Sequence, residues 1–113
     1  MAQRPLTPPA PRRGEIWLAD LDKRRPVVVL TRDPLGRLLH SVIVGPVTST
    51  VRGLSTEVEL GADDGMRMRS VVNLDNLQLL ARPRLVRRVG KAAPATMDLI
   101  CAACWTAIGC SAR

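Results

Sequence analysis

The apolar residues of this chain fall into short runs that are interrupted by Pro, Gly and Asp. Val27–Leu30 and Val42–Val44 are typical of these runs, because both are short and rich in β-branched side chains, which favour strands. About six or seven such runs can be placed before Gly90, each of strand length. The pattern predicts a mainly β protein.

The expected strands cover most of the chain between Gly14 and Gly90. Their predicted ranges are Glu15–Leu21, Pro26–Arg32, Leu38–Val47, Thr56–Leu60, Ser70–Leu74, Leu77–Ala81 and Val86–Val89. Beyond them the apolar spacing becomes helical, with Pro94 suited to a first turn and Gly109 to a C-terminal cap. We therefore expect one helix over Pro94–Ile108 that closes a small, strongly curved β-sheet or barrel.

The chain has 113 residues, of which 46% are hydrophobic, and this suffices for one domain with its own core. Pro recurs among polar residues near the N-terminus, so residues 1–12 are expected to form a disordered tail. Residues 13–110 are expected to form the single domain, and residues 111–113 a short C-terminal tail. Neither a membrane span nor a signal peptide is visible, which predicts a cytoplasmic location and no membrane partner.

The net charge of +7 comes almost entirely from arginine, since Lys23 and Lys91 are the only lysines. Guanidinium groups suit planar, two-point contact with phosphate better than ammonium groups do. The charge therefore indicates either a nucleic-acid or an acidic protein partner. A basic surface that serves solubility alone is an equally good interpretation of the charge by itself.

Two polar residues stand at the tips of the central strands. Arg25 comes just before the first, where Pro26 disfavours helix, and Thr48 comes just after the second. If the two strands are antiparallel, the start of one lies near the end of the other, and the guanidinium and hydroxyl lie side by side at one rim of the sheet. The alternative is structural: an ion pair of Arg25 with Asp20 or Asp22, and a Thr48 hydroxyl bonded to nearby backbone.

An ordered set of motifs between residue 12 or 13 and about residue 110 resembles the MazF/PemK-type toxins of bacterial toxin–antitoxin pairs. The segments that carry the resemblance are Arg13–Trp17 with Asp20-Leu21, Arg25–Leu30, Val44–Ser49, Thr56–Leu60, Ser70–Val72 with Asp75-Asn76, Val89-Gly90 and Pro94–Met97. Each motif alone is weak, and it is their order and spacing that make the resemblance specific.

This resemblance implies an SH3-like, CcdB/MazF-type β-barrel of six to seven strands with a C-terminal helix, assembled as a homodimer. It implies a sequence-specific, ribosome-independent endoribonuclease that cleaves single-stranded RNA without metal or cofactor, leaving 2′,3′-cyclic phosphate and 5′-hydroxyl ends. It also implies neutralisation by a cognate MazE-like antitoxin. Two alternatives remain open: a CcdB-like protein poison of a topoisomerase, and a catalytically weak RNA-binding module of the same fold.

Carried over position by position, the resemblance makes Arg25 and Thr48 the catalytic pair. The RNA-binding residues that it implies, or that flank this pair, are Lys23, Arg24, Ser49, Thr50, Arg52, Gly53, Leu54, Asp75 and Asn76. The loop Asp22–Arg24 is shorter than in many family members, which predicts slower cleavage or a different sequence preference.

Four other residues invite a chemical role, and each is better explained structurally. His40 precedes the third expected strand, at the opposite end from Thr48, and is expected to be a solvated edge residue. Cys101 and Cys104 lie in mid-helix, where small core residues are the better interpretation than a redox or zinc site. Trp17 is expected to be a core or dimer contact rather than a base-stacking platform.

Overall fold

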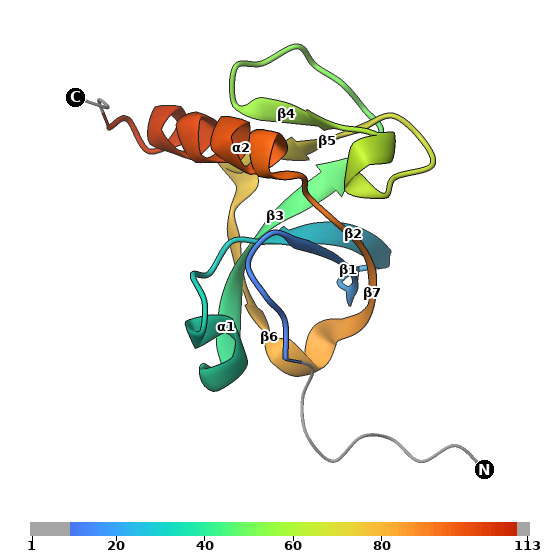
Figure 1. The fold of residues 1–113 in the computed structure, drawn as a ribbon, viewed down its shortest axis with the longest axis vertical. Coiled ribbons are helices and arrows are strands. Elements are labelled where there is room, and N and C mark those ends of the chain that lie inside the picture. The colour runs from blue at the N-terminus through green and yellow to red at the C-terminus, as the bar shows by residue number, and fades with distance from the viewer. Residues whose placement is uncertain (1–9, 111–113) are drawn as a thin grey trace.

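The computed structural model describes residues 10–110 (Figure 1). Within this range seven strands form one antiparallel sheet in the order β4-β5-β3-β2-β1-β7, and β6 also pairs with β3. The strands are β1 (Glu15–Asp20), β2 (Arg24–Val29), β3 (Ser41–Thr48), β4 (Glu57–Leu60), β5 (Ser70–Asn73), β6 (Gln78–Ala81) and β7 (Leu85–Lys91). The predicted mainly β, curved architecture is confirmed, but the sheet stays open, because its end strands β4 and β7 are not paired with each other.

Strand β3 holds the two parts of the sheet together. It pairs with β2 through Val44–Pro46, with β6 through Ser41–Val44, and with β5 through Val47 and Thr48. Gly45 lies where these partners change, and a Cβ atom there would come within 2.8 Å of Val72 Cγ2. Only glycine lets β3 and β5 approach this closely without displacing that side chain.

The helices cover the two ends of the sheet. Helix α2 (Pro94–Ala107) lies across β4 and β5, whereas the one-turn helix α1 (Leu35–Leu38) lies at the opposite end beside β6 (Figure 1). The predicted C-terminal helix is confirmed to within one residue. No helix in the described range 10–110 is long and apolar enough to cross a membrane.

Several predicted strand boundaries differ from the structure. The third strand was expected from Leu38, but Leu38 ends α1 and is 70% exposed, and β3 starts only where Ser41 finds a partner in β6. Gly90 was expected to end the last strand, yet it lies inside β7, where a Cβ atom would come within 2.5 Å of the Asp64 carbonyl oxygen. Arg25 lies within β2, and Thr48 is the last residue of β3.

The predicted N-terminal tail falls mostly outside the described residues, as do residues 111–113. Within it, Pro11 is fully buried, and Arg12 exchanges hydrogen bonds with Glu15 through its N–H and its carbonyl oxygen. Packing against the domain therefore begins before residue 13.

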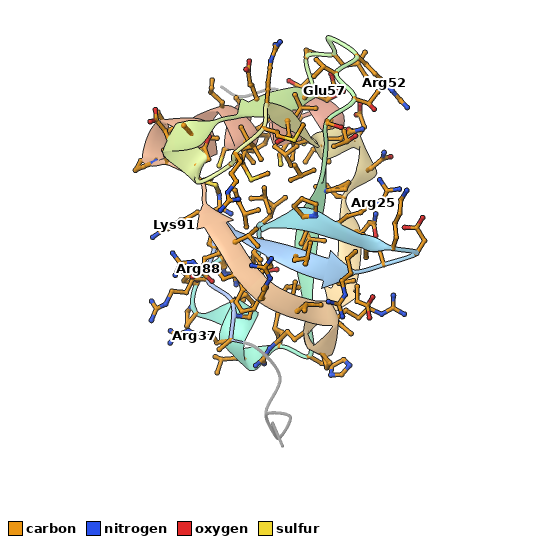
Figure 2. The ribbon with its side chains drawn as sticks, turned by 90° about the vertical axis from the view of Figure 1, so that its right-hand side faces the viewer. Arg25, Arg37, Arg52, Glu57, Arg88 and Lys91 are labelled. Carbon is orange, nitrogen blue, oxygen red and sulfur yellow. The ribbon has the colours of Figure 1, made fainter. Side chains whose placement is uncertain are left out.

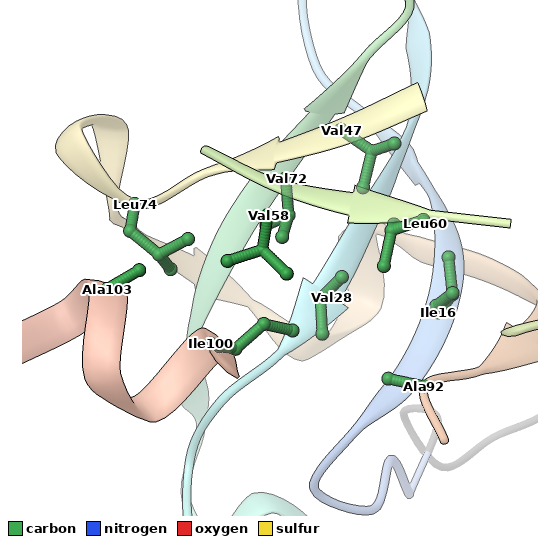
Figure 3. Close-up of a cluster of buried hydrophobic side chains, with 10 residues drawn as sticks. All are labelled: Ile16, Val28, Val47, Val58, Leu60, Val72, Leu74, Ala92, Ile100 and Ala103. Carbon is green, nitrogen blue, oxygen red and sulfur yellow. The ribbon is translucent and has the colours of Figure 1, made fainter. Parts of the chain in front are cut away.

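The sheet buries a cluster of apolar side chains on each of its faces. Val28 of β2 points into the larger cluster, which Ile100 and Ala103 of α2 cover (Figure 3). Its neighbours Val27 and Val29 point the other way, into a smaller cluster with Val44. Since residues 27–29 of β2 are buried on both faces of the sheet, this part of the strand is a continuous apolar run and does not alternate between apolar and polar residues.

Asp64 connects the loop after β4 to the start of α2. Its buried carboxylate accepts hydrogen bonds from the backbone N–H groups of Gly61 (3.0 Å) and Ala93 (2.8 Å), and from the Thr96 side chain. Burial by itself raises the pKa of this carboxyl, but the three hydrogen bonds favour the ionised form more strongly and lower its pKa below the usual range.

The lowered pKa of Asp64 gives a testable dependence of stability on pH. Its stabilising contribution is present above the unfolded value of about 3.9 and is lost as pH falls through the lower folded value. Asp64→Asn is therefore expected to lower the free energy of unfolding by about 1–3 kcal/mol at pH 7, as expected when a buried hydrogen-bonded charge is removed. Urea unfolding from pH 7 to pH 3 should show this gap shrinking as the pH falls. A gap that stayed constant would contradict the role of the charge.

Candidate active site

The register of β2 and β3 brings Arg25 and Thr48 together. Val27 pairs with Pro46 and Val28 with Gly45, so continuing the pairing by two residues places Arg25 opposite Thr48. Both side chains point to the same face, because each lies two residues from the Val27–Pro46 pair. Arg25 and Thr48 therefore lie at the same rim of the sheet.

The Arg25 side chain is held only loosely. Its Nε lies 3.5 Å from Asp22 Oδ1, so the expected structural alternative of an ion pair is also realised. The two side chains are 40% and 76% exposed, respectively. An exposed pair of this kind contributes little, at most about 1 kcal/mol, so an anionic ligand can displace Asp22.

Within the described part of the chain, the Thr48 hydroxyl uses its acceptor capacity but not its donor. Its Oγ1 accepts a hydrogen bond of 3.1 Å from the backbone N–H of Thr50, which is the local backbone contact expected from the sequence. Among residues 10–110 its O–H donates to no protein group. The hydroxyl can therefore donate a hydrogen bond to a ligand bound beside Arg25.

Two grooves meet at this pair, and both include Arg25, Val47 and Thr48 in their walls. The first groove, of about 510 Å³, lies toward β6 and the loop after β3, and is completed by Leu21, Asp22, Pro46, Thr50, Arg52, Glu57, Asn73, Asn76, Gln78 and Arg84. The second groove, of about 460 Å³, lies toward the loop before β5, and is completed by Lys23, Arg24, Pro26, Ser49, Met66, Met68, Arg69 and Ser70. An extended polymer could therefore cross the pair from one groove to the other.

Most of the RNA-binding residues expected from the sequence line these grooves. Thr50, Arg52 and Asn76 line the first groove, and Lys23, Arg24 and Ser49 line the second. The remaining three, Gly53, Leu54 and Asp75, line neither groove.

These three residues have other surroundings. Gly53 and Leu54 lie exposed in the loop after β3, where Gly53 has a positive φ of 74°. Asp75 accepts hydrogen bonds from the hydroxyl of Thr56 and from no group in the grooves, so it ties the start of β4 to the turn after β5. The Asp75 carboxylate thus has a structural partner.

Several residues that line the first groove were not predicted from the sequence as site residues. Asn73 and Gln78 flank the expected Asp75-Asn76 pair and lie at the end of β5 and the start of β6. Gln78 is the one polar residue in the otherwise apolar strand Gln78–Ala81, and this contrast is the sequence signal that marks it as a candidate groove residue. Glu57 gives no such signal, because it sits in a regular alternating strand, where a charged residue normally faces solvent.

Glu57 instead holds the loop that follows Thr48. Its carboxylate accepts hydrogen bonds from the backbone N–H groups of Arg52 (3.0 Å) and Leu54 (3.1 Å), and its own N–H donates to the Leu54 carbonyl oxygen at 3.0 Å. These contacts fix the backbone that carries Arg52 into the first groove. Figure 2 shows Arg52 and Glu57 together at the end of the molecule beyond Arg25.

Replacing Glu57 with Ala is expected to loosen this loop without unfolding the domain. The amide hydrogens of Arg52 and Leu54 should exchange with solvent about 5-fold faster, since each loses a partner worth about 1 kcal/mol. Glu57→Gln keeps one acceptor oxygen and should restore part of the protection. Hydrogen exchange followed by NMR measures this, with Asp63→Ala, an exposed carboxylate on another loop, as control. Unchanged exchange in Glu57→Ala would contradict the contact.

Several other cations are committed to structural contacts. Arg69 pairs with Glu59 (2.8 Å) although it lines the second groove, and Arg88 pairs with the buried Glu15 at 3.2 Å. Arg82 donates hydrogen bonds to the carbonyl oxygens of residues 37 and 39, which anchors α1. Arg37, Arg88 and Lys91 lie on the side of the molecule away from Arg25 and Arg52 (Figure 2).

The other expected structural residues are placed as follows. His40 is exposed just before β3. Cys101 accepts a hydrogen bond from Arg13 (3.0 Å), and burial, together with the nearby Cys101, raises the pKa of the Cys104 thiol in spite of Arg13. Trp17 packs against the smaller core and donates its indole N–H to Glu15 at 3.1 Å.

The fold and the site together define a small, basic, antiparallel β-protein whose sheet rim presents an arginine and a hydroxyl to two grooves. Residues 12–105 match the family described as PemK-like, MazF-like toxin of type II toxin–antitoxin systems. The chain belongs to this family.

Individual relatives agree with this assignment. The chain is 42% identical over 104 residues to the probable endoribonuclease MazF5 of Mycobacterium tuberculosis, covering 89% of this chain and 95% of that protein. Among solved structures, it resembles the M. tuberculosis toxin MazF-mt6 with a TM-score of 0.83 and 38% identity, covering 87% of this chain and 99% of the other. A mycobacterial endoribonuclease in complex with its cognate antitoxin gives a TM-score of 0.85 at 30% identity, covering 92% of this chain and all of the other.

Proposed function

We propose that this protein is a sequence-specific endoribonuclease toxin that cleaves single-stranded RNA without a metal ion. The observation that carries the proposal is that Arg25 of β2 and Thr48 of the neighbouring strand β3 both line the two grooves, at the point where these meet. Relatives that carry the name endoribonuclease support the choice of RNA as the substrate.

The pair suits cleavage by the RNA's own 2′-hydroxyl. That oxygen attacks the adjacent phosphorus, the bond to the 5′-oxygen breaks, and the proton lost by the 2′-hydroxyl is balanced by one gained at the 5′-oxygen. The products are a 2′,3′-cyclic phosphate and a 5′-hydroxyl. The enzyme must hold the phosphate in line and stabilise charge on its non-bridging oxygens.

Each side chain has a role in this reaction. The Arg25 guanidinium donates two parallel hydrogen bonds to the non-bridging oxygens, in the fork geometry that phosphate favours. The Thr48 hydroxyl donates a third. Because an arginine side chain stays protonated in proteins, its contribution is electrostatic stabilisation and positioning.

Two partners complete the proposal. A cognate antitoxin would cover the grooves, as suggested by the mycobacterial endoribonuclease that was solved in complex with its own antitoxin. The basic groove walls favour an acidic segment of that antitoxin. We further propose that the protein acts as a homodimer, which the family resemblance implies.

The direct test is incubation of the purified protein with a long single-stranded RNA in the presence of EDTA. We expect cuts at a short recurring sequence, found by primer extension, and 5′-hydroxyl ends that a polynucleotide kinase labels without prior phosphatase treatment. Cleavage that EDTA abolishes would overturn the metal-free mechanism. Intact RNA with salt-sensitive binding would identify a non-catalytic RNA-binding module, and intact RNA with an inhibited topoisomerase would identify a protein poison.

A further inference from the structure

The two grooves that meet at Arg25 and Thr48 differ in charge. The second groove is lined by the cations Lys23, Arg24 and Arg25, by Arg69, whose charge is paired with Glu59, and by no carboxylate within the described residues. In the first groove the cations Arg25, Arg52 and Arg84 face the carboxylates of Asp22 and Glu57. The electrostatic attraction for a phosphate backbone is therefore concentrated in the second groove.

The first groove has a different chemistry, because three carboxamide side chains line it: Asn73, Asn76 and Gln78. A carboxamide offers donors and an acceptor at fixed positions, which is the pattern needed to match the edge of a nucleic-acid base. The second groove has no carboxamide among the described residues; it has Met66 and Met68, whose polarizable side chains pack on flat rings of any kind.

Gln78 is the best placed of these carboxamides to select a base. It is the first residue of β6 and lies opposite Val44 of β3, so its backbone is fixed by the sheet. Its side chain lies on the same face as Leu80, beyond the edge of the smaller core, and is exposed. Within residues 10–110 its amide group makes no hydrogen bond to protein, so both its donors and its acceptor are open to a ligand.

Asn73 and Asn76 support this placement. The Asn73 side-chain oxygen accepts the N–H of Asp75 at 2.9 Å, which fixes the single turn between β5 and β6 that carries Asn76. The carboxamides therefore stand on a rigid part of the fold, as specificity requires.

We propose that the two sides of the scissile phosphate are recognised differently: Gln78 and Asn76 select the bases in the first groove, and Lys23 and Arg24 hold the backbone in the second without regard to sequence. This inference rests on the proposed endoribonuclease function and adds to it the residues that set the cleavage sequence. Sequence preference should accordingly lie mainly on one side of the cut.

The test compares cleavage maps of wild-type and variant proteins on a pool of RNAs randomised on both sides of the site. Gln78→Ala is expected to reduce discrimination by about 5- to 100-fold at positions on one side of the cut, the range given by loss of a two-point base contact. Gln78→Glu can only accept hydrogen bonds, so it should shift preference toward bases that present an amino group.

The matched variants act on the other groove. Arg24→Ala is expected to slow cleavage of all sequences alike and to lower the slope of log kcat/KM against log salt concentration by about 1. Arg37→Ala, an exposed cation on the far side of the molecule, controls for the loss of one positive charge (Figure 2).

The outcomes separate the two proposals. If the wild-type protein cleaves at a defined sequence and Gln78→Ala leaves that sequence unchanged, the assignment of base selection to the first groove is wrong. A changed sequence preference in Arg24→Ala would also overturn it. If the wild-type protein makes no cut, it is the proposed function that fails. Since the Gln78 side chain is exposed, thermal unfolding should show all of these variants to be folded.

Discussion

Replacing Arg25 with Ala is expected to lower kcat on a fixed RNA oligonucleotide by about 10²–10³-fold, the loss typical for removing one preorganised donor from a developing oxyanion. The effect should be on kcat more than on KM, because the second groove keeps its other cations and still binds the backbone. Single-turnover cleavage of an oligonucleotide with one site measures both quantities.

Two further variants make the Arg25 result specific. Arg25→Lys keeps the positive charge but loses the two-point fork, so it should recover only part of the activity. Arg37→Ala removes an exposed cation far from the site and should leave kcat unchanged (Figure 2). The free energy of unfolding of Arg25→Ala should stay within about 1 kcal/mol of wild type, since only an exposed ion pair with Asp22 is lost. Full activity in Arg25→Ala would remove this residue from the mechanism.

The second large effect is expected for Thr48. Thr48→Val keeps the shape of the side chain and its place in β3 but removes the hydroxyl, and kcat is expected to fall by about 10- to 100-fold, as for one lost neutral hydrogen bond to the transition state. The same single-turnover assay measures the loss.

Thr48→Ser is the matched variant, because it restores a hydroxyl without the methyl group. It should recover most of the rate if the O–H contacts the phosphate. Thr48→Ser also restores the acceptor for the Thr50 N–H, so it does not tell contact with the phosphate from contact with the loop. Thr50→Pro separates these two roles, because proline has no N–H to donate to the Thr48 hydroxyl. Loss of activity in Thr50→Pro equal to that in Thr48→Val would indicate that the Thr48 hydroxyl acts only by shaping the loop.

The site depends on β3 more than on any other element. This strand carries Thr48, pairs with the strand that carries Arg25, and pairs with β6, which carries Gln78. Gly45 lets this strand approach β5 closely, and Asn73 at the end of β5 and Gln78 at the start of β6 line the first groove. The proposed catalytic pair and the proposed base-selecting residue Gln78 are thus held by neighbouring strands of one sheet.

The sequence by itself determined that the chain has these strands and the closing helix, and it placed the proposed catalytic pair, Arg25 and Thr48, at the strand tips. The periodicity of a strand or a helix is a local property of the sequence. Pro26 lies next to Arg25 near the start of one strand, and the β-branched residues that follow it identify that strand. The family motifs added the function that these elements serve.

Only the tertiary structure decided which polar side chains face the grooves and which are bound elsewhere. Asp75 was expected at the RNA, but its carboxylate accepts a hydrogen bond from Thr56, whereas Glu57, from a regular alternating strand, binds the loop that carries Arg52. Gln78 reaches the groove only because β6 pairs with β3 across more than thirty residues of sequence. The physical reason is that a side chain's partners come from segments distant in the chain, and no local pattern encodes which of them will meet.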